Sequence, residues 1–470
     1  MDNGYGIRNP RTGQVDYWIM PPTPEQLGIQ CSRLREAQID WHLGGLTQRI
    51  EALQQWKEAL FSHKDELIEA LVTDTGRFFV SVQEVDSLIF SIDRWCELAE
   101  ELLLPEKEKT TAIPFIHMQN EWVPYSLVGV ISPWNFPLLL STTDTIPALL
   151  AGCAVVVKPS EIAPRFIQPL VETIDSVPAL REVLAYFEGT AETGATLVDC
   201  VDLICFTGSV ETGQQVAEEA ARRFIPAFLE LGGKDPAIVL ESAGLDLATS
   251  AILWGSVFNS GQSCVSIERI YVAESVCDRF VEQLVEKAQQ LHFAYPTVED
   301  GEIGPIIAEK QAAIITEHIQ DAVQNGAVVC CGGGIQELDG GLWCRPTILT
   351  HVNHSMKVMT EETFGPIMPI MSFSTVEEAV QLANDSIYGL SAAVFAESET
   401  EALKIAQRLE AGAISINDAT LTAVVHEAEK NAFKFSGMGG SRMGLAALKR
   451  FMRKKVFLIQ TESVPNPWWF

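Results

Sequence analysis

The chain has 470 residues, of which 33 are Lys or Arg and 62 are Asp or Glu, so its formal net charge is −29. Hydrophobic residues make up 47% and charged residues 20%, a balance that is typical of globular proteins and excludes disordered and collagen-like chains. A surface this acidic repels phosphates and anionic lipids, which argues against nucleic acid and membrane surfaces as partners.

The N-terminal sequence MDNGYGIRNP lacks the basic start and apolar core of a signal peptide. The longest apolar stretch, around residues 138–157, is interrupted by Asp144, Pro147 and Gly152, so we expect neither an export signal nor a membrane span. Ten cysteines are scattered without a CxxC pair or a Cys/His ligand spacing. This distribution favours reduced thiols in a cytoplasmic protein without a metal centre over a disulfide framework.

Residues 24–110 carry apolar side chains at helical spacing, as in the run from Arg49 to Val72, and are predicted to be helical. The segment 111–126, TAIPFIHMQNEWVPYS, is instead rich in β-forming residues. We expect a hairpin there, with its turn at Gln119-Asn120.

From Leu127 to Lys234 apolar strands alternate with helices, and the strands read VGVIS, CAVVVKPS, VDLICFTGS and FLELGG. A second series begins near Pro236 with AIVL, RIYVA, AVVCC, IMPIMSF and AAVFA. This alternation predicts an α/β fold with parallel sheets that are covered on both faces. Such sheets bind ligands at the carboxyl ends of their strands, which is where the polar motifs of the first series stand.

The tail after Gly444 is predicted to form a basic helix, ALKRFMRKK, followed by VFLIQ and the aromatic end PNPWWF. Exposed aromatic side chains at a terminus are unusual in a monomer, so this end indicates an interface.

Three residues are candidates for chemistry on a carbonyl carbon. Cys264, in FNSGQSCVSIERIYV, is either a buried structural cysteine or a reactive thiol. Glu230 ends the strand in FLELGG, and it is the better candidate base because no histidine is clearly paired with Cys264; a surface or helix-capping glutamate is the alternative. Asn135, in SPWNFP, can donate its amide to an oxyanion or bond its own backbone in a turn.

Two further motifs suit a nucleotide. Lys158 and Glu161, in KPSE, end a predicted strand and could hold two ribose hydroxyls, or they could form a solvated turn. Gly208 and Ser209, in FTGSVETG, begin a predicted helix whose free N–H groups can hold a pyrophosphate. The dinucleotide fingerprint GxGxxG is not present in this segment.

Together these segments resemble the NAD(P)-dependent aldehyde dehydrogenase superfamily, from about Trp41 to Lys455. PWNFP, KPSE, FTGS, LELGGK, GQSC, EETFGP and a late SGMG segment follow each other in the family's order. The separation between Glu230 and Cys264 is also similar to that of the family.

The resemblance implies a fold with a Rossmann-like cofactor domain, an α/β catalytic domain and a β oligomerisation arm. The implied limits are 1–110 and 127–232 for the NAD-binding domain, 233–430 for the catalytic domain, and 111–126 with 445–470 for the arm and tail. A homodimer or homotetramer follows from the same resemblance.

The resemblance also implies the reaction. Cys264 attacks an aldehyde and forms a thiohemiacetal, whose oxyanion Asn135 and the backbone N–H of Cys264 hold. Hydride transfer gives a thioester, and water activated by Glu230 hydrolyses it to a carboxylic acid. The implied cofactor contacts are Trp134, Lys158, Glu161, Gly208, Ser209, Glu362 and Phe364.

Glu161 also bears on the choice of cofactor, because a carboxylate that bonds the ribose 2′-OH repels a 2′-phosphate. We therefore expect NAD to be preferred over NADP, which some members of the family also accept.

The substrate is expected to be a hydrophobic aldehyde, aromatic or of medium to long chain, because no arginine anchor for a carboxylate is evident. Many relatives carry PFGG before the late SG segment, where this chain reads NAFKF, and that region helps form the family's substrate channel. The alternatives are a semialdehyde dehydrogenase, a Cys-dependent esterase and a non-catalytic binding protein. The aromatic residues that could line the channel are Trp41, Phe78, Phe79, Trp254 and Phe258, although for most of them a place in the hydrophobic core is the better interpretation.

Overall fold

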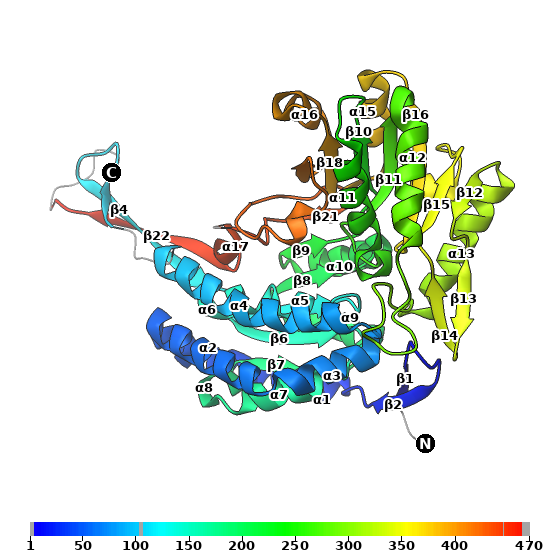
Figure 1. Ribbon diagram of the computed structural model, residues 1–470. Coiled ribbons are helices and arrows are strands. Elements are labelled where there is room, and N and C mark those ends of the chain that lie inside the picture. The colour runs from blue at the N-terminus through cyan, green and yellow to red at the C-terminus, as the bar shows by residue number, and fades with distance from the viewer. Residues whose placement is uncertain (1–3, 103–106, 445, 463–470) are drawn as a thin grey trace.

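Two sheets built mainly of parallel strands dominate the molecule, and a long antiparallel arm projects from its body (Figure 1). The computed structural model describes residues 4–102, 107–444 and 446–462. Each sheet has its own hydrophobic core with helices packed around it. The α/β architecture predicted from the alternating strands is confirmed.

The chain begins with a small antiparallel ribbon and a layer of helices. The ribbon is formed by β1 (Tyr5–Arg8) and β2 (Val15–Ile19), and the helices are α1 (Pro24–Leu43), α2 (Gly45–Ser62), α3 (Lys64–Thr75) and α4 (Phe78–Leu102). Helix α1 starts at a capping box between Thr23 and Gln26. Helix α3 ends at Gly76, whose φ of +70° is a conformation that glycine adopts easily. The helical region expected for 24–110 is confirmed as far as Leu102, whereas Lys109–Thr110 form a strand and not a helix.

The first sheet has six strands in the order β21-β9-β8-β5-β6-β7, all parallel except β21. They are β5 (Leu127–Ser132), β6 (Ala154–Pro159), β7 (Leu184–Tyr186), β8 (Leu203–Thr207), β9 (Ala227–Glu230) and β21 (Gly437–Met438). The connecting helices are α5 (Pro137–Thr142), α6 (Thr145–Ala151), α7 (Ile167–Asp175), α8 (Pro178–Arg181), α9 (Ala191–Cys200) and α10 (Val210–Arg223). The strand order reverses at β5, since β6 lies on one side of it and β8 on the other, and such a reversal leaves a crevice at the carboxyl ends.

The second sheet has seven strands in the order β12-β15-β16-β11-β10-β18-β19, all parallel except β12. They are β10 (Asp235–Val239), β11 (Ile267–Ala273), β12 (Val328–Cys331), β15 (Thr347–Thr350), β16 (Ile367–Phe373), β18 (Ser391–Phe395) and β19 (Ala413–Ile416). The helices of this half are α11 (Leu245–Val257), α12 (Glu274–Gln289), α13 (Glu309–Gln324), α14 (Lys357–Thr360), α15 (Val376–Asn384) and α16 (Glu399–Ala406). Smaller elements are the 3-10 helices η1 (Phe258–Gly261) and η2 (Leu421–Ala423), and two ribbons, β13 (Ile335–Leu338) with β14 (Gly341–Cys344) and β17 (Tyr388–Gly389) with β20 (Phe433–Lys434).

A short connection places the two sheets end to end. Strand β9 stops at Glu230 and β10 starts at Asp235, so the carboxyl end of the first sheet lies next to the amino end of the second. Near the other end of the chain, β21 returns to the first sheet and pairs Gly437 with Glu230. Glu230 therefore lies where the connection between the two sheets meets a segment that is about 200 positions away in sequence.

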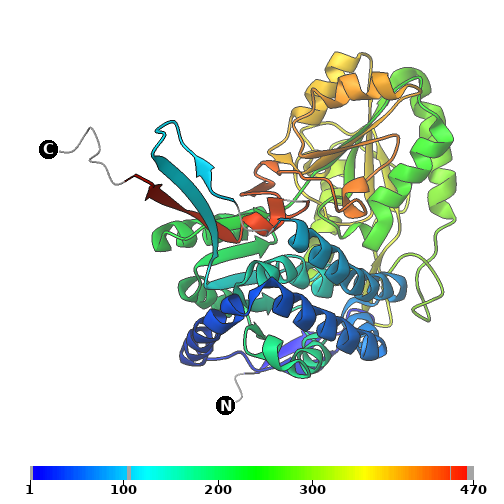
Figure 2. The ribbon, with the colours of Figure 1, turned by 90° about the vertical axis from the view of Figure 1, so that its left-hand side faces the viewer.

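The arm is a three-stranded sheet in the order β22-β4-β3, and it extends away from the body in both views (Figures 1 and 2). Its strands are β3 (Lys109–Thr110), β4 (Ile116–Pro124) and β22 (Met452–Gln460). The β character expected for 111–126 is found in β4, but the turn predicted at Gln119-Asn120 is wrong. Both residues lie inside β4, because Gln119 pairs with Phe457 and Asn120 with Val456 in an uninterrupted register.

The basic helix expected after Gly444 is also shorter than predicted. Helix α17 covers only Ala446–Lys449, and Arg453, Lys454 and Lys455 belong to β22. Pairing with β4 stabilises the extended form, and Lys454 Nζ lies 4.8 Å from the ring centroid of Trp122 on that strand. The aromatic end PNPWWF lies outside the described residues.

No helix of the described residues is both long and apolar enough to span a bilayer.

A buried carboxylate ties the C-terminal part of the chain to the first sheet. Asp144, just before α6, accepts a hydrogen bond of 2.6 Å from Arg442 and a second one from Arg450. Arg442 also donates to Thr207 at the end of β8, at 3.1 Å. Burial alone would raise the pKa of Asp144, but the two arginines hold it below its usual value.

We predict that Asp144→Ala strongly destabilises the fold, because it leaves two buried guanidinium groups without their anion. Loss of one partner of such a buried pair costs about 3–5 kcal/mol. The depressed pKa means that this stabilisation is present at neutral pH and is lost as the pH falls through the folded-state pKa. Urea unfolding followed by tryptophan fluorescence measures both effects.

The matched control is Glu121→Ala, which removes an exposed ion pair with Lys455 at 3.4 Å on the arm. Exposed pairs contribute about 0–1 kcal/mol. Equal unfolding midpoints for the two variants would contradict the role given to Asp144.

Candidate active site

One large cavity opens where the carboxyl ends of the first sheet meet the loops that precede β11 and β16. Its volume is about 960 Å³. All ten residues predicted for the site line it, namely Trp134, Asn135, Lys158, Glu161, Gly208, Ser209, Glu230, Cys264, Glu362 and Phe364. The folding of the chain thus brings together motifs that are up to 230 positions apart, and the roles predicted for these residues stay predictions.

One end of the cavity has the features of a nucleotide site. Lys158 Nζ lies 2.9 Å from Glu161 Oε2 at the end of β6. Ser209 caps α10, and its Oγ accepts a hydrogen bond of 3.3 Å from the N–H of Thr212. A Cβ atom on Gly208 would overlap the ring of Phe206. The bare glycine and the free N–H groups at the start of α10 therefore form a cradle that suits a pyrophosphate.

The other end of the cavity is closed by the loop that carries Glu362 and Phe364. Phe364 has a φ of +51°, and its ring meets that of Trp134 edge-on at a centroid distance of 5.5 Å. Glu362 Oε1 accepts a hydrogen bond of 3.1 Å from Gly233 N–H. Burial and the neighbouring Glu268 raise the pKa of Glu362 to about 8.

A buried ion pair holds this loop in place. Glu268, on β11, accepts hydrogen bonds from the backbone N–H groups of Thr363 at 2.7 Å and Phe364 at 2.8 Å. Lys234 Nζ lies 2.6 Å from Glu268 and 2.9 Å from the hydroxyl of Thr363. The sequence analysis missed Glu268, because a single glutamate in an apolar strand carries no motif.

Cys264 lies between η1 and β11, and its backbone is packed against the connection between the sheets. A Cβ atom on Gly233 would overlap the carbonyl oxygen of Cys264. Burial raises the pKa of the Cys264 thiol to about 12, and Glu362, Asp235 and Glu230 add to this effect. Lys430 acts in the opposite direction and lowers it. At neutral pH the thiol is therefore protonated in this state.

Asn135 is tied to the loop that leads to Cys264. Its Nδ2 donates to the carbonyl of Gln262 at 3.1 Å. Asn259 donates to the carbonyls of Asn135 at 3.0 Å and of Gln262 at 2.9 Å. Because a carboxamide nitrogen carries two hydrogens, Asn135 can donate a second hydrogen bond besides the one to Gln262.

Glu230 is half-buried at the end of β9, between Thr207 of β8 and Gly437 of β21. Despite burial, Asp144 and Glu230 raise the pKa of Arg442 above its usual range. The carboxylate that ends this strand therefore acts electrostatically on the same guanidinium that ties the C-terminal segment to the sheet.

The aromatic residues suggested for a substrate channel separate into two groups. Trp41 belongs to the core, where it is 3% exposed and donates to the carbonyl of Leu149. Trp254 is 41% exposed and packs on Phe258 at a centroid distance of 5.1 Å, and Phe258 stacks on Phe136 at 6.0 Å. Phe136 follows Asn135 in the chain, so this array leads from the surface to the loop that carries Asn135.

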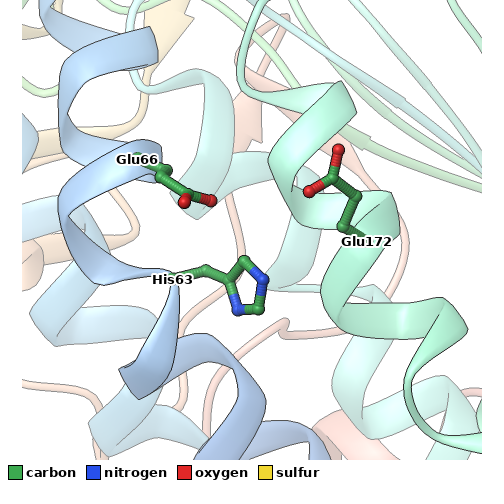
Figure 3. A group of neighbouring side chains, drawn as sticks. All are labelled: His63, Glu66 and Glu172. Carbon is green, nitrogen blue, oxygen red and sulfur yellow. The ribbon is translucent and has the colours of Figure 1, made fainter.

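A separate group of potential metal ligands lies on the surface (Figure 3). His63 and Glu66 come from the start of α3 and Glu172 from α7, and both carboxylates are exposed. None of the three lines the cavity. They do not contribute to the site described above.

Comparisons with known proteins point to one family. The family model described as "Aldehyde dehydrogenase family" matches residues 2–457. A Mycolicibacterium smegmatis protein named "Putative succinate-semialdehyde dehydrogenase", with NADP(+) in its name, is 34% identical over 431 residues, which is 91% of this chain and 83% of that protein. The 4,4'-diapolycopene aldehyde oxidase of a Methylomonas species is 34% identical over 426 residues, which is 90% of this chain and 78% of that protein.

Solved structures give the same result. The structure described as "Putative Aldehyde Dehydrogenase PutA" from Anabaena variabilis is 67% identical, with a TM-score of 0.98 and 100% of both chains covered. Betaine aldehyde dehydrogenase from Staphylococcus aureus, solved in complex with NAD+, is 30% identical, with a TM-score of 0.93 and with 99% of this chain and 93% of that chain covered.

We predict that alkylation of Cys264 by iodoacetamide, in the absence of cofactor, accelerates with pH and reaches no plateau below pH 9. Only the thiolate reacts, and the pKa of Cys264 is raised to about 12, whereas that of a free cysteine is about 8.5. Lys430→Met should slow the reaction at any fixed pH, because it removes the cation that lowers this pKa. Mass spectrometry of the peptide that contains Cys264 separates this thiol from the other nine.

Lys434→Met is the matched control, because Lys434 lies on the same segment but its Nζ bonds the carbonyls of Asn384 and Ser386. This variant should leave the rate unchanged. A plateau reached by pH 8 in the unmodified protein would contradict the raised pKa.

Proposed function

Because this chain belongs to the aldehyde dehydrogenase family, we propose that it oxidises an aldehyde to a carboxylic acid through a covalent intermediate on Cys264, with NAD as the electron acceptor. The observation that carries this proposal is the convergence of Cys264, Glu230 and Asn135 on one cavity that also contains a dinucleotide cradle. An aldehyde-oxidising, NAD(P)-dependent enzyme needs these parts side by side.

The reaction starts at the thiol. Cys264 passes its proton to the candidate base Glu230, which releases it to solvent before the hydrolysis step. Lys430 favours this transfer by lowering the thiol pKa, and the thiolate attacks the carbonyl carbon. The oxyanion of the resulting thiohemiacetal is held by the free amide hydrogen of Asn135 and the backbone N–H of Cys264. When NAD is bound, it supplies the acceptor for the hydride whose loss converts the adduct into a thioester.

Hydrolysis completes the cycle. Glu230 takes a proton from a water molecule, and the hydroxide attacks the thioester carbonyl, while Asn135 again holds the oxyanion. The carbon–sulfur bond breaks, the carboxylic acid leaves and the thiol of Cys264 is restored.

The adenosine and pyrophosphate parts of the cofactor would be held by Lys158, Glu161, Gly208 and Ser209. Trp134, Glu362 and Phe364 would hold its nicotinamide part.

We infer that NAD is preferred over NADP, because the carboxylate of Glu161 is paired with Lys158 at the end of β6, where it would oppose a 2′-phosphate. The names of relatives point both ways, with NADP(+) in that of the M. smegmatis protein and NAD+ in that of the S. aureus complex. Glu161 is a feature of this chain itself and supports NAD.

The first candidate substrate is a hydrophobic aldehyde, aromatic or of medium to long chain. The stacked rings of Phe136, Phe258 and Trp254 support it, because they offer an apolar path to the thiol.

The second candidate is an aldehyde that carries a carboxylate, as in the succinate semialdehyde named for one of the relatives. Lys430 supports this alternative. It is half-buried and acts on both Cys264 and Asp235, and within the described part of the chain its ammonium takes part in no hydrogen bond or ion pair. Lys430 would bind the carboxylate of the substrate, for which no arginine is evident in the sequence.

The structure supports two further proposals on assembly and location. The arm strand β22 exposes Val456, Phe457 and Leu458 and lies at the edge of its sheet, which supports a homodimer or homotetramer built on this arm. All ten cysteines are free thiols, which supports a reducing compartment such as the cytoplasm.

We also propose the domain limits given above, with 1–110 and 127–232 binding the cofactor and 233–430 forming the catalytic domain. The two separate hydrophobic cores support this division.

We predict NADH formation, measured at 340 nm, from several members of an aldehyde panel with NAD and slower turnover with NADP. Cys264→Ala should abolish it, because no covalent adduct forms. Glu230→Gln should keep one rapid turnover of NADH per site and lower the steady rate by about a hundredfold or more, since general base catalysis is lost. Aldehyde oxidation at the normal rate in Cys264→Ala would contradict the mechanism, and ester hydrolysis without aldehyde oxidation would favour a hydrolase.

We predict that Lys430→Met separates the two substrate classes. The measured quantity is the ratio of kcat/KM for a semialdehyde to kcat/KM for an uncharged aldehyde of equal length, because the ratio cancels the effect on the thiol. If Lys430 binds the carboxylate, this ratio falls at least about tenfold, as expected for a charged hydrogen bond, whereas Lys434→Met leaves it unchanged. An unchanged ratio in Lys430→Met would exclude the semialdehyde proposal.

A further inference from the structure

A buried ion pair outside the cavity lining joins the N-terminal helices to the loops around Cys264. Arg77 lies between α3 and α4, and Glu84 lies on the first turns of α4. Arg77 Nη2 is 3.3 Å from Glu84 Oε1, and their side chains are 4% and 1% exposed. Neither residue belongs to a recognisable motif, and neither takes part in the chemistry proposed above.

Arg77 reaches the loop before Cys264. Its Nη1 donates to Oδ1 of Asn259, which in turn donates to the carbonyls of Asn135 and Gln262. Asn259 has a φ of +56° and the next residue, Ser260, has a φ of +55°. Residues other than glycine rarely adopt this backbone conformation, and it persists only where surrounding contacts hold it.

Glu84 holds the loop of Asn135 from its other end. Its Oε2 accepts hydrogen bonds from the backbone N–H groups of Leu138 at 3.2 Å and Leu139 at 3.1 Å, at the start of α5. The guanidinium of Arg77 also lies 5.5 Å from the ring centroid of Phe136. The ion pair thus contacts the chain on both sides of Asn135 and, through Asn259, the loop that ends at Cys264.

We propose that Arg77 and Glu84 are positioning residues, which set the distance between the amide of Asn135 and the backbone N–H of Cys264. This inference rests on the proposed function, since those two donors form its oxyanion site. Buried ion pairs add little net stability compared with apolar residues of the same volume. What this pair supplies is a fixed geometry, because it contacts both loops from the helical layer behind them.

The experiment uses the full-length protein and compares Glu84→Gln with the unmodified chain. Three rates are measured: aldehyde oxidation with NAD, hydrolysis of p-nitrophenyl acetate without NAD, and alkylation of Cys264 by iodoacetamide. The first two need the oxyanion donors and should fall together by about 10- to 100-fold, which is the effect of a misplacement near 1 Å. Alkylation needs no oxyanion donor and should change less than about twofold, as should KM for NAD.

A double-mutant cycle with Asn135→Ala tests whether Glu84 acts through Asn135. In the Asn135→Ala background, Glu84→Gln should cause little additional loss, because the donor that it positions is already gone. Full additivity of the two losses would overturn the proposal. Arg77→Lys, which keeps the charge but not the fork of donors, should fall between Glu84→Gln and the unmodified protein. It is also the variant to use if Glu84→Gln does not fold.

Asp74→Asn is the matched control, because it breaks another buried pair in the same helical layer. Asp74 is 1% exposed and lies 2.8 Å from Arg165 Nε, and neither residue lines the cavity. This variant should lose stability and keep its rates. Unchanged rates in Glu84→Gln, or an equal loss of alkylation, would overturn the inference. Inactivity of the unmodified protein on every aldehyde and ester would instead reject the proposed function.

Discussion

The site depends on how closely two glycines let the backbone approach its neighbours. Between Glu230 and Asp235 the chain crosses from one sheet to the other. Neither glycine in this connection has room for a Cβ atom: Gly232 lies against the carboxylate of Glu362, and Gly233 lies against the carbonyl of Cys264. This contact brings the loop of Glu362, the backbone of Cys264 and the end of β9 together. A side chain at Gly232 would push away the carboxylate of Glu362, and one at Gly233 would push away the backbone of Cys264.

Buried ion pairs then fix segments that sequence separates widely. Lys234 and Glu268 hold the loop of Phe364, Asp144 holds the C-terminal segment through Arg442, and Arg77 with Glu84 holds the loops of Asn135 and Cys264. Each pair sits where backbone groups or strained residues need a polar partner, and a hydrophobic contact cannot supply directional hydrogen bonds. Because the parts of the site come from different sheets and helices, directional contacts of this kind are needed to give the cavity one geometry.

The sequence predicted those parts of the fold and site whose physics is local. Strand ends marked by glycine or proline, such as KPSE and LELGGK, indicated the residues that line the cavity, since the local chain chemistry shows where a strand must stop. The Arg77–Asn259 contact joins residues 182 positions apart and could not be predicted, because no local pattern encodes it. The prediction of a turn at Gln119-Asn120 was wrong for a related reason, because pairing with β22, more than 300 residues later, keeps β4 extended. The sequence left open whether Trp41 lies in the core or along a channel, because helical spacing does not show which aromatic side chains reach a cavity.

The charges around Cys264 constrain both candidate substrates. Three carboxylates, those of Glu230, Glu362 and Asp235, oppose the thiolate, and Lys430 is the cation that favours it. A semialdehyde whose carboxylate pairs with Lys430 would neutralise this cation and make the thiolate harder to form at the moment of attack. An uncharged aldehyde held by Phe136 and Phe258 would leave Lys430 free to act on the thiol. Binding of an anionic substrate and stabilisation of the thiolate would therefore compete for the ammonium group of Lys430. An uncharged aldehyde would avoid this competition.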